Sequence, residues 1–216
     1  MLKTLLILVL ILLAARHIRW RYETHNIETP PSTSTYIWDV EIRSMPSVLV
    51  ASVLVPGDEI NSPNDSFRQL AWFIFWDNAS HDKIEMTAPV TSRTMNTKDK
   101  DNEKIAMTAP VTSTIVWQMT QVSFVMPSKW TIDALPIPNN PDITISETDP
   151  KTLTVWKFGG YATKNNIARE KEKFVQALKS NDISRSGEMT LAQYNDPRTP
   201  AWMRTNEWWV EMVEKR

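Results

Sequence analysis

A ten-residue segment occurs twice in this chain, and it restricts the possible folds more than any other feature. Residues 83–92 read KIEMTAPVTS and residues 104–113 read KIAMTAPVTS, so the copies differ only at Glu85 against Ala106. In both copies apolar side chains occupy alternate positions, the period of a β-strand with one buried face. The proline of each copy cannot donate to a strand ladder and belongs at an edge or a bulge. The repeat predicts two strands, the second more enclosed because it carries Ala106.

The segments around the repeat predict further strands. Residues 36–44 alternate in polarity and residues 47–55 are rich in β-branched side chains, so a turn at Met45 and Pro46 makes them a predicted hairpin. Later strand patterns occupy residues 116–127, 143–148, 153–162 and 206–213. The chain therefore has enough strand segments for one large antiparallel sheet.

Two helices are predicted between these strands. The first begins near Ser66, where the spacing to Gln69 is that of a capping box. Its apolar face carries Phe67, Leu70, Ala71 and Ile74 at helical spacing, which leaves Trp72 and Trp76 on the opposite face. The second helix covers residues 166–180, with residues 169–173 turned to water and an apolar stripe of Ile167, Phe174, Val175 and Leu178. The predicted order is ββαββ twice, which favours one closed antiparallel sheet with two helices, of α+β class.

The N-terminus predicts a membrane segment. Residues 2–15 are apolar except for Lys3, and the Arg-rich stretch that follows contains Trp20 and Tyr22, as at a membrane interface. We interpret residues 1–24 as an anchor or signal segment, residues 25–35 as a linker and residues 36–216 as the domain. An uncleaved single-pass anchor is favoured, with the domain slightly favoured on the extracytoplasmic side.

The scarcity of reactive side chains argues against several chemistries. The chain has no cysteine and three histidines, His17, His25 and His81, of which only His81 falls near the domain body. Disulfides and cysteine nucleophiles are excluded, and no Ser-His-Asp set can be assembled. The net charge of −1 favours no nucleic-acid partner. Acidic residues look too evenly spread to nominate a carboxylate pair. We therefore expect a binding protein and not an enzyme, with no metal ligand set.

Together with the repeated K-I-x-M-T-A-P-V segment, several other stretches resemble the SOUL haem-binding family. They are EIR at 41–43, FRQLAWFIF at 67–75, FVMPSKWTIDALPIPNNPDI at 124–143, FGGYA at 158–162, YNDP at 194–197 and RTNEWW at 204–209. The resemblance covers nearly everything from residue 28 to residue 213. It implies a distorted β-barrel with two helices in two pseudo-symmetric ββαββ halves.

The same resemblance implies reversible binding of haem or another porphyrin in an apolar groove near the first helix, as a carrier or buffer at a membrane. Alignment through FRQLAWFIF gives the cofactor-binding positions, with two nearby cations for the propionates. These residues are Asn64, Phe67, Ala71 and Trp72 on the helix, Pro200 near the C-terminus, and the cations Arg68 and Arg204. The alternative is a protein-interaction or general hydrophobic small-ligand module that binds no haem.

Overall fold

The computed structural model of the 216-residue chain describes residues 28–56, 64–79, 105–106, 108–116, 119–195 and 199–213. In these ranges the protein consists of a large antiparallel sheet and two α-helices, α2 (Asn64–Phe75) and α3 (Lys164–Ser180), which confirms the α+β class. The sheet strands are β1 (Thr33–Ile37), β2 (Val40–Met45), β3 (Leu49–Pro56), β5 (Val111–Val116), β6 (Met119–Val125), β8 (Ile143–Glu147), β9 (Lys151–Gly159), β10 (Arg185–Gln193) and β11 (Thr205–Met212). A separate pair, β4 (Asn78–Ala79) and β7 (Ile137–Pro138), and the 3₁₀ helix η1 (Ala201–Met203) complete the described elements.

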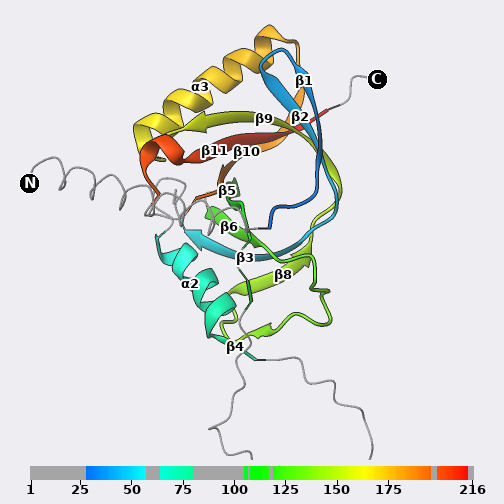
Figure 1. The fold of residues 1–216 in the computed structure, drawn as a ribbon, viewed down its shortest axis with the longest axis vertical. Helices are drawn as coiled ribbons and strands as arrows, with labels where there is room; N and C mark the ends of the chain where they lie inside the picture. The colour runs from blue at the N-terminus through cyan, green and yellow to red at the C-terminus, as the bar shows by residue number, and fades with distance from the viewer. Residues whose placement is uncertain are drawn as a thin grey trace, which may run out of the picture.

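The large sheet is curved and open. Its strands pair in the order β1-β2-β9-β11-β10-β5-β6-β3-β8, and Figure 1 shows the sheet bending round with α3 and α2 on its outer side. Among the described residues β1 and β8 are its two ends and do not pair with each other, so the predicted closed barrel is not found. β8 is a short strand between Pro141 and Pro150, and proline cannot extend a ladder.

The predicted hairpin of residues 36–44 and 47–55 is wrong. Trp38 and Asp39 form a turn inside the first segment, with φ of 55° at Trp38, and β1 pairs with β2 across it. β2 then pairs with β9, whereas β3 pairs with β6 and β8. Alternation predicts that a segment is a strand, but its partner depends on long-range burial that no local pattern contains.

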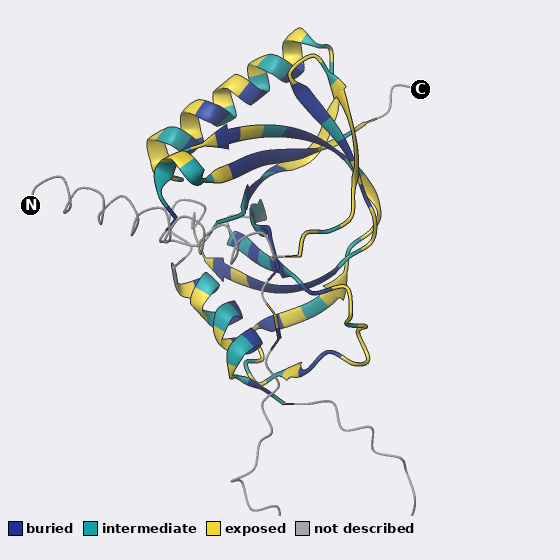
Figure 2. Cartoon of the chain, in the orientation of Figure 1, coloured by how far each residue is buried: buried dark blue, intermediate teal, exposed yellow. Residues whose placement is uncertain are grey.

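Each helix covers one part of the outer face of the sheet. α2 buries Leu70, Phe73 and Ile74 against a cluster from β3 and β6, and α3 buries Phe174 against a cluster that includes Trp208. Figure 2 shows the buried side of both helices turned to the sheet and the exposed side turned away. The predicted apolar face of the first helix is confirmed in Leu70 and Ile74, and Phe73 adds to it.

Two details of the helices differ from the prediction. α2 begins at Asn64, so Ser66 lies inside the helix and is buried, and Gln69 Oε1 accepts a hydrogen bond from Asn140 Nδ2 at 3.0 Å instead of completing a capping box. Glu170, predicted to face water, is buried. Its carboxylate accepts hydrogen bonds from Lys173, Arg169 and Trp156 at 2.9, 3.1 and 3.3 Å. Asn140 and Trp156, which lie outside the two helices, provide the tertiary partners of Gln69 and Glu170, and the sequence spacing does not reveal them.

The second copy of the repeat is only partly a strand. β5 begins at Val111, directly after Pro110, while Ile105 is buried and its N–H donates to Ile74 O at 2.8 Å. Ala106 is exposed, so its small side chain does not mark an enclosed position as predicted. The first copy, Met107 and His81 lie outside the described residues.

The segment predicted as a linker contributes to the domain. β1 already begins at Thr33. Glu28, further toward the N-terminus, also contacts the domain, because its carbonyl oxygen accepts a hydrogen bond from Ala109 N at 3.0 Å and its Oε1 accepts one from Ser128 N at 2.9 Å. The folded part therefore extends at least to residue 28. Residues 1–24 lie outside the described ranges, and within those ranges neither helix has the length and apolar content to cross a bilayer.

Candidate functional site

The inner face of the curved sheet carries a group of charged and aromatic side chains that comes from three neighbouring strands. In β2 the alternation that turns Val40 toward α3 turns Glu41 and Arg43 to the opposite face. β9 lies between β2 and β11, with Glu41 opposite Val155 and Glu207 opposite Lys157 in the two registers. The sheet register therefore brings the four charges together.

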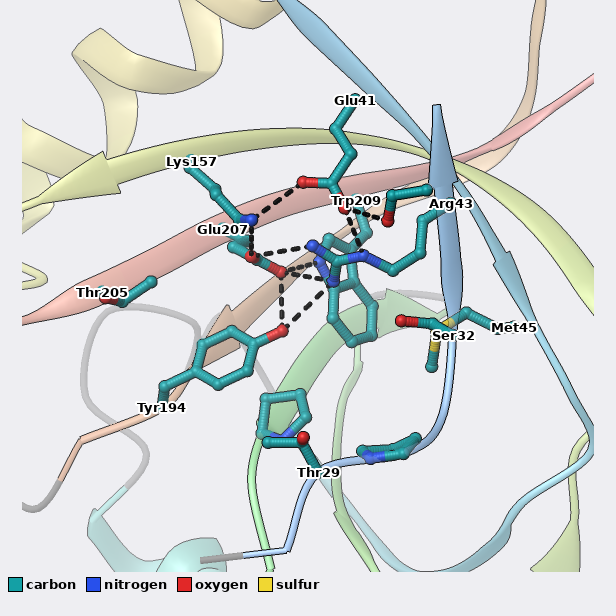
Figure 3. A pocket seen from close by; sticks show the side chains of 13 residues that line it. Thr29, Ser32, Glu41, Arg43, Met45, Lys157, Tyr194, Thr205, Glu207 and Trp209 are labelled. Atoms are coloured by element: carbon teal, nitrogen blue, oxygen red, sulfur yellow. Dashed lines mark hydrogen bonds and ion pairs between the residues drawn. The ribbon is translucent and has the colours of Figure 1, made fainter. Parts of the chain in front are cut away.

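Arg43 is the centre of this group. Its guanidinium donates to both oxygens of Glu207 at 2.8 and 3.0 Å, and its Nε donates to Glu41 Oε1 at 2.8 Å. Tyr194 Oη and Trp209 Nε1 also donate to Glu207 Oε2, each at 2.7 Å. Figure 3 shows these side chains pointing toward one another. A fork of donors between two carboxylates is a geometry that arginine, and not lysine, provides.

Burial makes this cluster electrostatically strong. Glu41, Arg43 and Glu207 are 4%, 7% and 2% exposed. Burial alone raises the pKa of Glu41, but hydrogen bonds from Arg43 and Ser34 and the nearby Lys157 ammonium outweigh it and lower that pKa to about 2. Burial lowers the pKa of Arg43, and its hydrogen bonds with the two carboxylates more than reverse this, so the guanidinium stays charged.

Lys157 completes the charge balance from the rim. Its side chain is 53% exposed, and its Nζ lies 2.9 Å from Glu41 Oε2 and 3.8 Å from Glu207 Oε1. Glu41 Oε2 is buried, and the Lys157 ammonium at 2.9 Å is the partner that the described part of the chain offers it. Two carboxylates and one guanidinium are buried, and the second cation is not.

A cavity of about 390 Å³ opens beside the cluster. Its charged wall is the group just described, and its remaining walls come from Met45, Trp209, Tyr194, Pro30 and Pro110, with hydroxyl groups of Thr29, Ser32 and Thr205. Figure 3 shows Thr29, Ser32 and Met45 on the side of the cavity away from Lys157. A cavity of this size and composition suits a small ligand with an apolar body and one charged group.

None of the residues predicted to bind a ligand belongs to this site. The acidic residues look too evenly spread along the sequence to form a carboxylate pair, yet Glu41 and Glu207 meet at the guanidinium of Arg43, which lies 164 positions from Glu207. A signal was present, because the EIR, YNDP and RTNEWW motifs contain Glu41, Arg43, Tyr194, Glu207 and Trp209. Charged side chains within apolar strands indicate buried charges, and buried charges require partners. Three motifs of this kind therefore indicate that their polar side chains pair with one another.

The predicted binding residues lie elsewhere, on α2 and on either side of η1. Trp72 is 57% exposed, Phe67 and Ala71 are half-buried, and the Phe67 ring contacts Phe124 with centroids 5.2 Å apart. Arg68 is exposed and its Nη2 pairs with Asp65 at 2.9 Å. For Asn64 the structure describes the backbone only.

Arg204 and Pro200 flank η1 and are both half-buried. Arg204 Nε donates to Thr199 O at 2.7 Å, and the guanidinium lies 4.7 Å from the Tyr161 ring centroid. The guanidinium is therefore held by its own loop and is less available to a ligand than the guanidinium of Arg68.

Solved structures share this fold at low sequence identity. An uncharacterized conserved protein from Listeria innocua aligns with a TM-score of 0.53 and 9% identity, covering 81% of this chain and 92% of its own. A hydrolase from the same organism aligns with a TM-score of 0.53 and 9% identity over 90% and 98% of the two chains. The EcmrR C-terminal domain gives 0.53 and 9% over 83% and 100%. At such identities the likeness shows the fold alone.

No curated protein matches the chain. The model of one family does, over residues 27–101 and 95–211, which together span most of the sequence and include every motif quoted above. That match covers the strands of the buried cluster as well as α2. The chain belongs to the family of SOUL heme-binding proteins.

Proposed function

We propose that this protein binds haem or another tetrapyrrole reversibly on the outer face of α2, as a carrier or buffer and not as an enzyme. Family membership supports the ligand class. The main evidence for the position of the binding site is Trp72, a large aromatic side chain that is 57% exposed on a helix whose other face packs in the core. Contiguous exposed apolar surface usually marks a binding site.

The residues on this face fit a flat ligand with acidic substituents. Trp72 and the half-buried Phe67 and Ala71 offer apolar contact to a macrocycle. The pair of Arg68 with Asp65 is exposed to solvent, and such pairs are weak enough for the guanidinium to turn to a propionate. The inner cavity does not fit this ligand, because the buried carboxylates of Glu41 and Glu207 would repel propionates.

The change Trp72→Ala tests this proposal. Loss of about 80 Å² of apolar contact corresponds to about 2 kcal/mol, or roughly a thirtyfold weaker affinity for haemin. The free energy of unfolding should fall by less than about 1.5 kcal/mol, because the side chain is already half in water. Haemin titration of the full chain in non-ionic detergent, followed by Soret absorbance and tryptophan quenching, measures the first effect, and urea unfolding measures the second.

Trp38→Ala is the matched control, since Trp38 is 87% exposed at the turn between β1 and β2, away from α2. It should leave haemin affinity unchanged. An unchanged affinity in Trp72→Ala, or an equal loss in both variants, would remove the α2 face as the binding site.

We propose further that residues 1–24 hold the domain at a membrane. A chain that begins at His25 keeps Glu28 and its contacts to Ala109 and Ser128. It should unfold cooperatively and stay in the supernatant when mixed with phospholipid vesicles, whereas the full chain should float with them. Aggregation of the shortened chain, or its flotation with vesicles, would contradict this division.

A further inference from the structure

The charges around the inner cavity do not balance without Lys157. Glu41 and Glu207 supply two buried negative charges, and Arg43 supplies one buried positive charge. The remaining cation, Lys157, is 53% exposed on the strand between them. An exposed ammonium is well hydrated and mobile, so it compensates the buried charge without being fixed in the cavity.

One buried oxygen in the cavity depends on the half-exposed Lys157 ammonium. Ser34 and Arg43 both donate to Glu41 Oε1, at 2.6 and 2.8 Å, whereas Oε2 is paired, within the described residues, with Lys157 Nζ at 2.9 Å. Glu41 is 4% exposed and lines the cavity. A buried carboxylate oxygen needs a donor, and a ligand ammonium that enters the cavity can take the place of the half-exposed Lys157 ammonium.

The other walls of the cavity suit an apolar body. Trp209 and Tyr194 present aromatic rings, and Met45, Pro30 and Pro110 present aliphatic surface. Aromatic faces also attract cations. With about 390 Å³ the cavity is near the small end of ligand pockets, which limits the occupant to roughly one ring and a short arm.

We propose that the inner cavity is a second ligand site, separate from the α2 face, which takes a small organic cation with an apolar body. The ammonium of the ligand replaces the Lys157 ammonium beside Glu41 Oε2, and its apolar part lies against Trp209 and Met45. Lys157 then swings into solvent. The proposal is independent of tetrapyrrole binding.

Phenethylammonium, phenethyl alcohol and phenylacetate are the probes, titrated calorimetrically into the full chain in non-ionic detergent. Phenethylammonium should bind at least roughly tenfold more tightly than its neutral analogue, which lacks the ion pair. Lys157→Gln removes the competing cation and should tighten phenethylammonium binding roughly tenfold. Glu41→Gln removes the carboxylate and should weaken it by a similar factor. A purely structural role of Lys157 would not produce tighter binding.

Lys151→Gln is the matched control, because Lys151 is an exposed lysine at the start of the same strand. It should bind all probes as the unchanged chain does. Thermal unfolding of each variant shows whether it is folded, and Lys157→Gln keeps the test valid if Glu41→Gln is not. The proposal fails if the alcohol binds as tightly as the ammonium, if phenylacetate is preferred, if Lys157→Gln weakens phenethylammonium binding, or if no probe binds. Haemin affinity should be unchanged in Lys157→Gln, so the two proposals fail separately.

Discussion

Arg43→Met should lower the free energy of unfolding by about 3–5 kcal/mol, the typical cost of breaking a buried ion pair from one side. Arg43 is the only cation among the described residues that is buried between Glu41 and Glu207, and it donates to both. Methionine fills a similar volume but donates nothing. Of the cations that contact the two carboxylates in the described residues, the half-exposed ammonium of Lys157 would then remain alone. Urea unfolding at neutral pH measures this loss.

The loss should shrink in acid, and the sign follows from Glu41. Its pKa is lowered from 4.5 to about 2 in the folded protein, so it favours folding above pH 4.5 and this contribution disappears as pH falls toward 2. Removal of Arg43 removes the largest cause of that lowering. The stability difference between the unchanged chain and Arg43→Met should therefore be full at neutral pH and decrease below pH 4.5.

Two further variants serve as controls for Arg43→Met. Arg68→Met breaks a pair whose side chains are 66% and 70% exposed and should cost less than about 1 kcal/mol. Arg43→Lys keeps the charge but loses the fork and should fall between the two. If Arg43→Met costs no more than Arg68→Met, or if its cost does not depend on pH, the cluster does not stabilise the fold as described.

Trp208→Ala should lower the free energy of unfolding by about 3–5 kcal/mol through loss of core packing. Trp208 is 1% exposed in the cluster beneath α3, where Phe174 and Leu191 are also buried. Its Nε1 donates to Ile167 O at 3.2 Å, which connects β11 to the first turns of α3. The substitution leaves a cavity beneath α3 and removes the hydrogen bond to Ile167, so α3 should be held less tightly on the sheet. Amide hydrogen exchange in α3 should therefore become faster as the free energy of unfolding falls.

Trp202→Ala is the control for this prediction, since Trp202 is 85% exposed. Its removal should change the free energy of unfolding by less than about 0.5 kcal/mol. Equal losses in Trp208→Ala and Trp202→Ala would mean that the packing of α3 on the sheet contributes little to stability.

The tryptophans show how much about burial can be predicted from residue type alone. Ten tryptophans in a chain of 216 residues are typical of deep packing or of an aromatic binding surface. Both occur: Trp208 and Trp209 are buried on opposite faces of one strand, in separate clusters, while Trp72 and Trp76 are exposed on α2. Helical spacing predicted the exposed pair, because the period of a helix depends only on its backbone. The burial of Trp208 and Trp209 was not predicted, because a strand that is covered on both faces shows no alternation of polar and apolar residues.

Local sequence periods determined the two helices and most of the strands of this protein, and the family motifs identified its family. The periods merged β1 and β2 into one strand and did not indicate β10. They determined which face of α2 is core, through Leu70 and Ile74, and they left Trp72 outside. They did not determine that β2 pairs with β9 and not with β3, nor that the sheet stays open. Strand partners are selected by burial summed over the whole sheet, and a slip of one residue would turn Glu41 and Arg43 to the wrong face. Only the tertiary structure therefore places Glu41, Arg43 and Glu207 in one buried cluster.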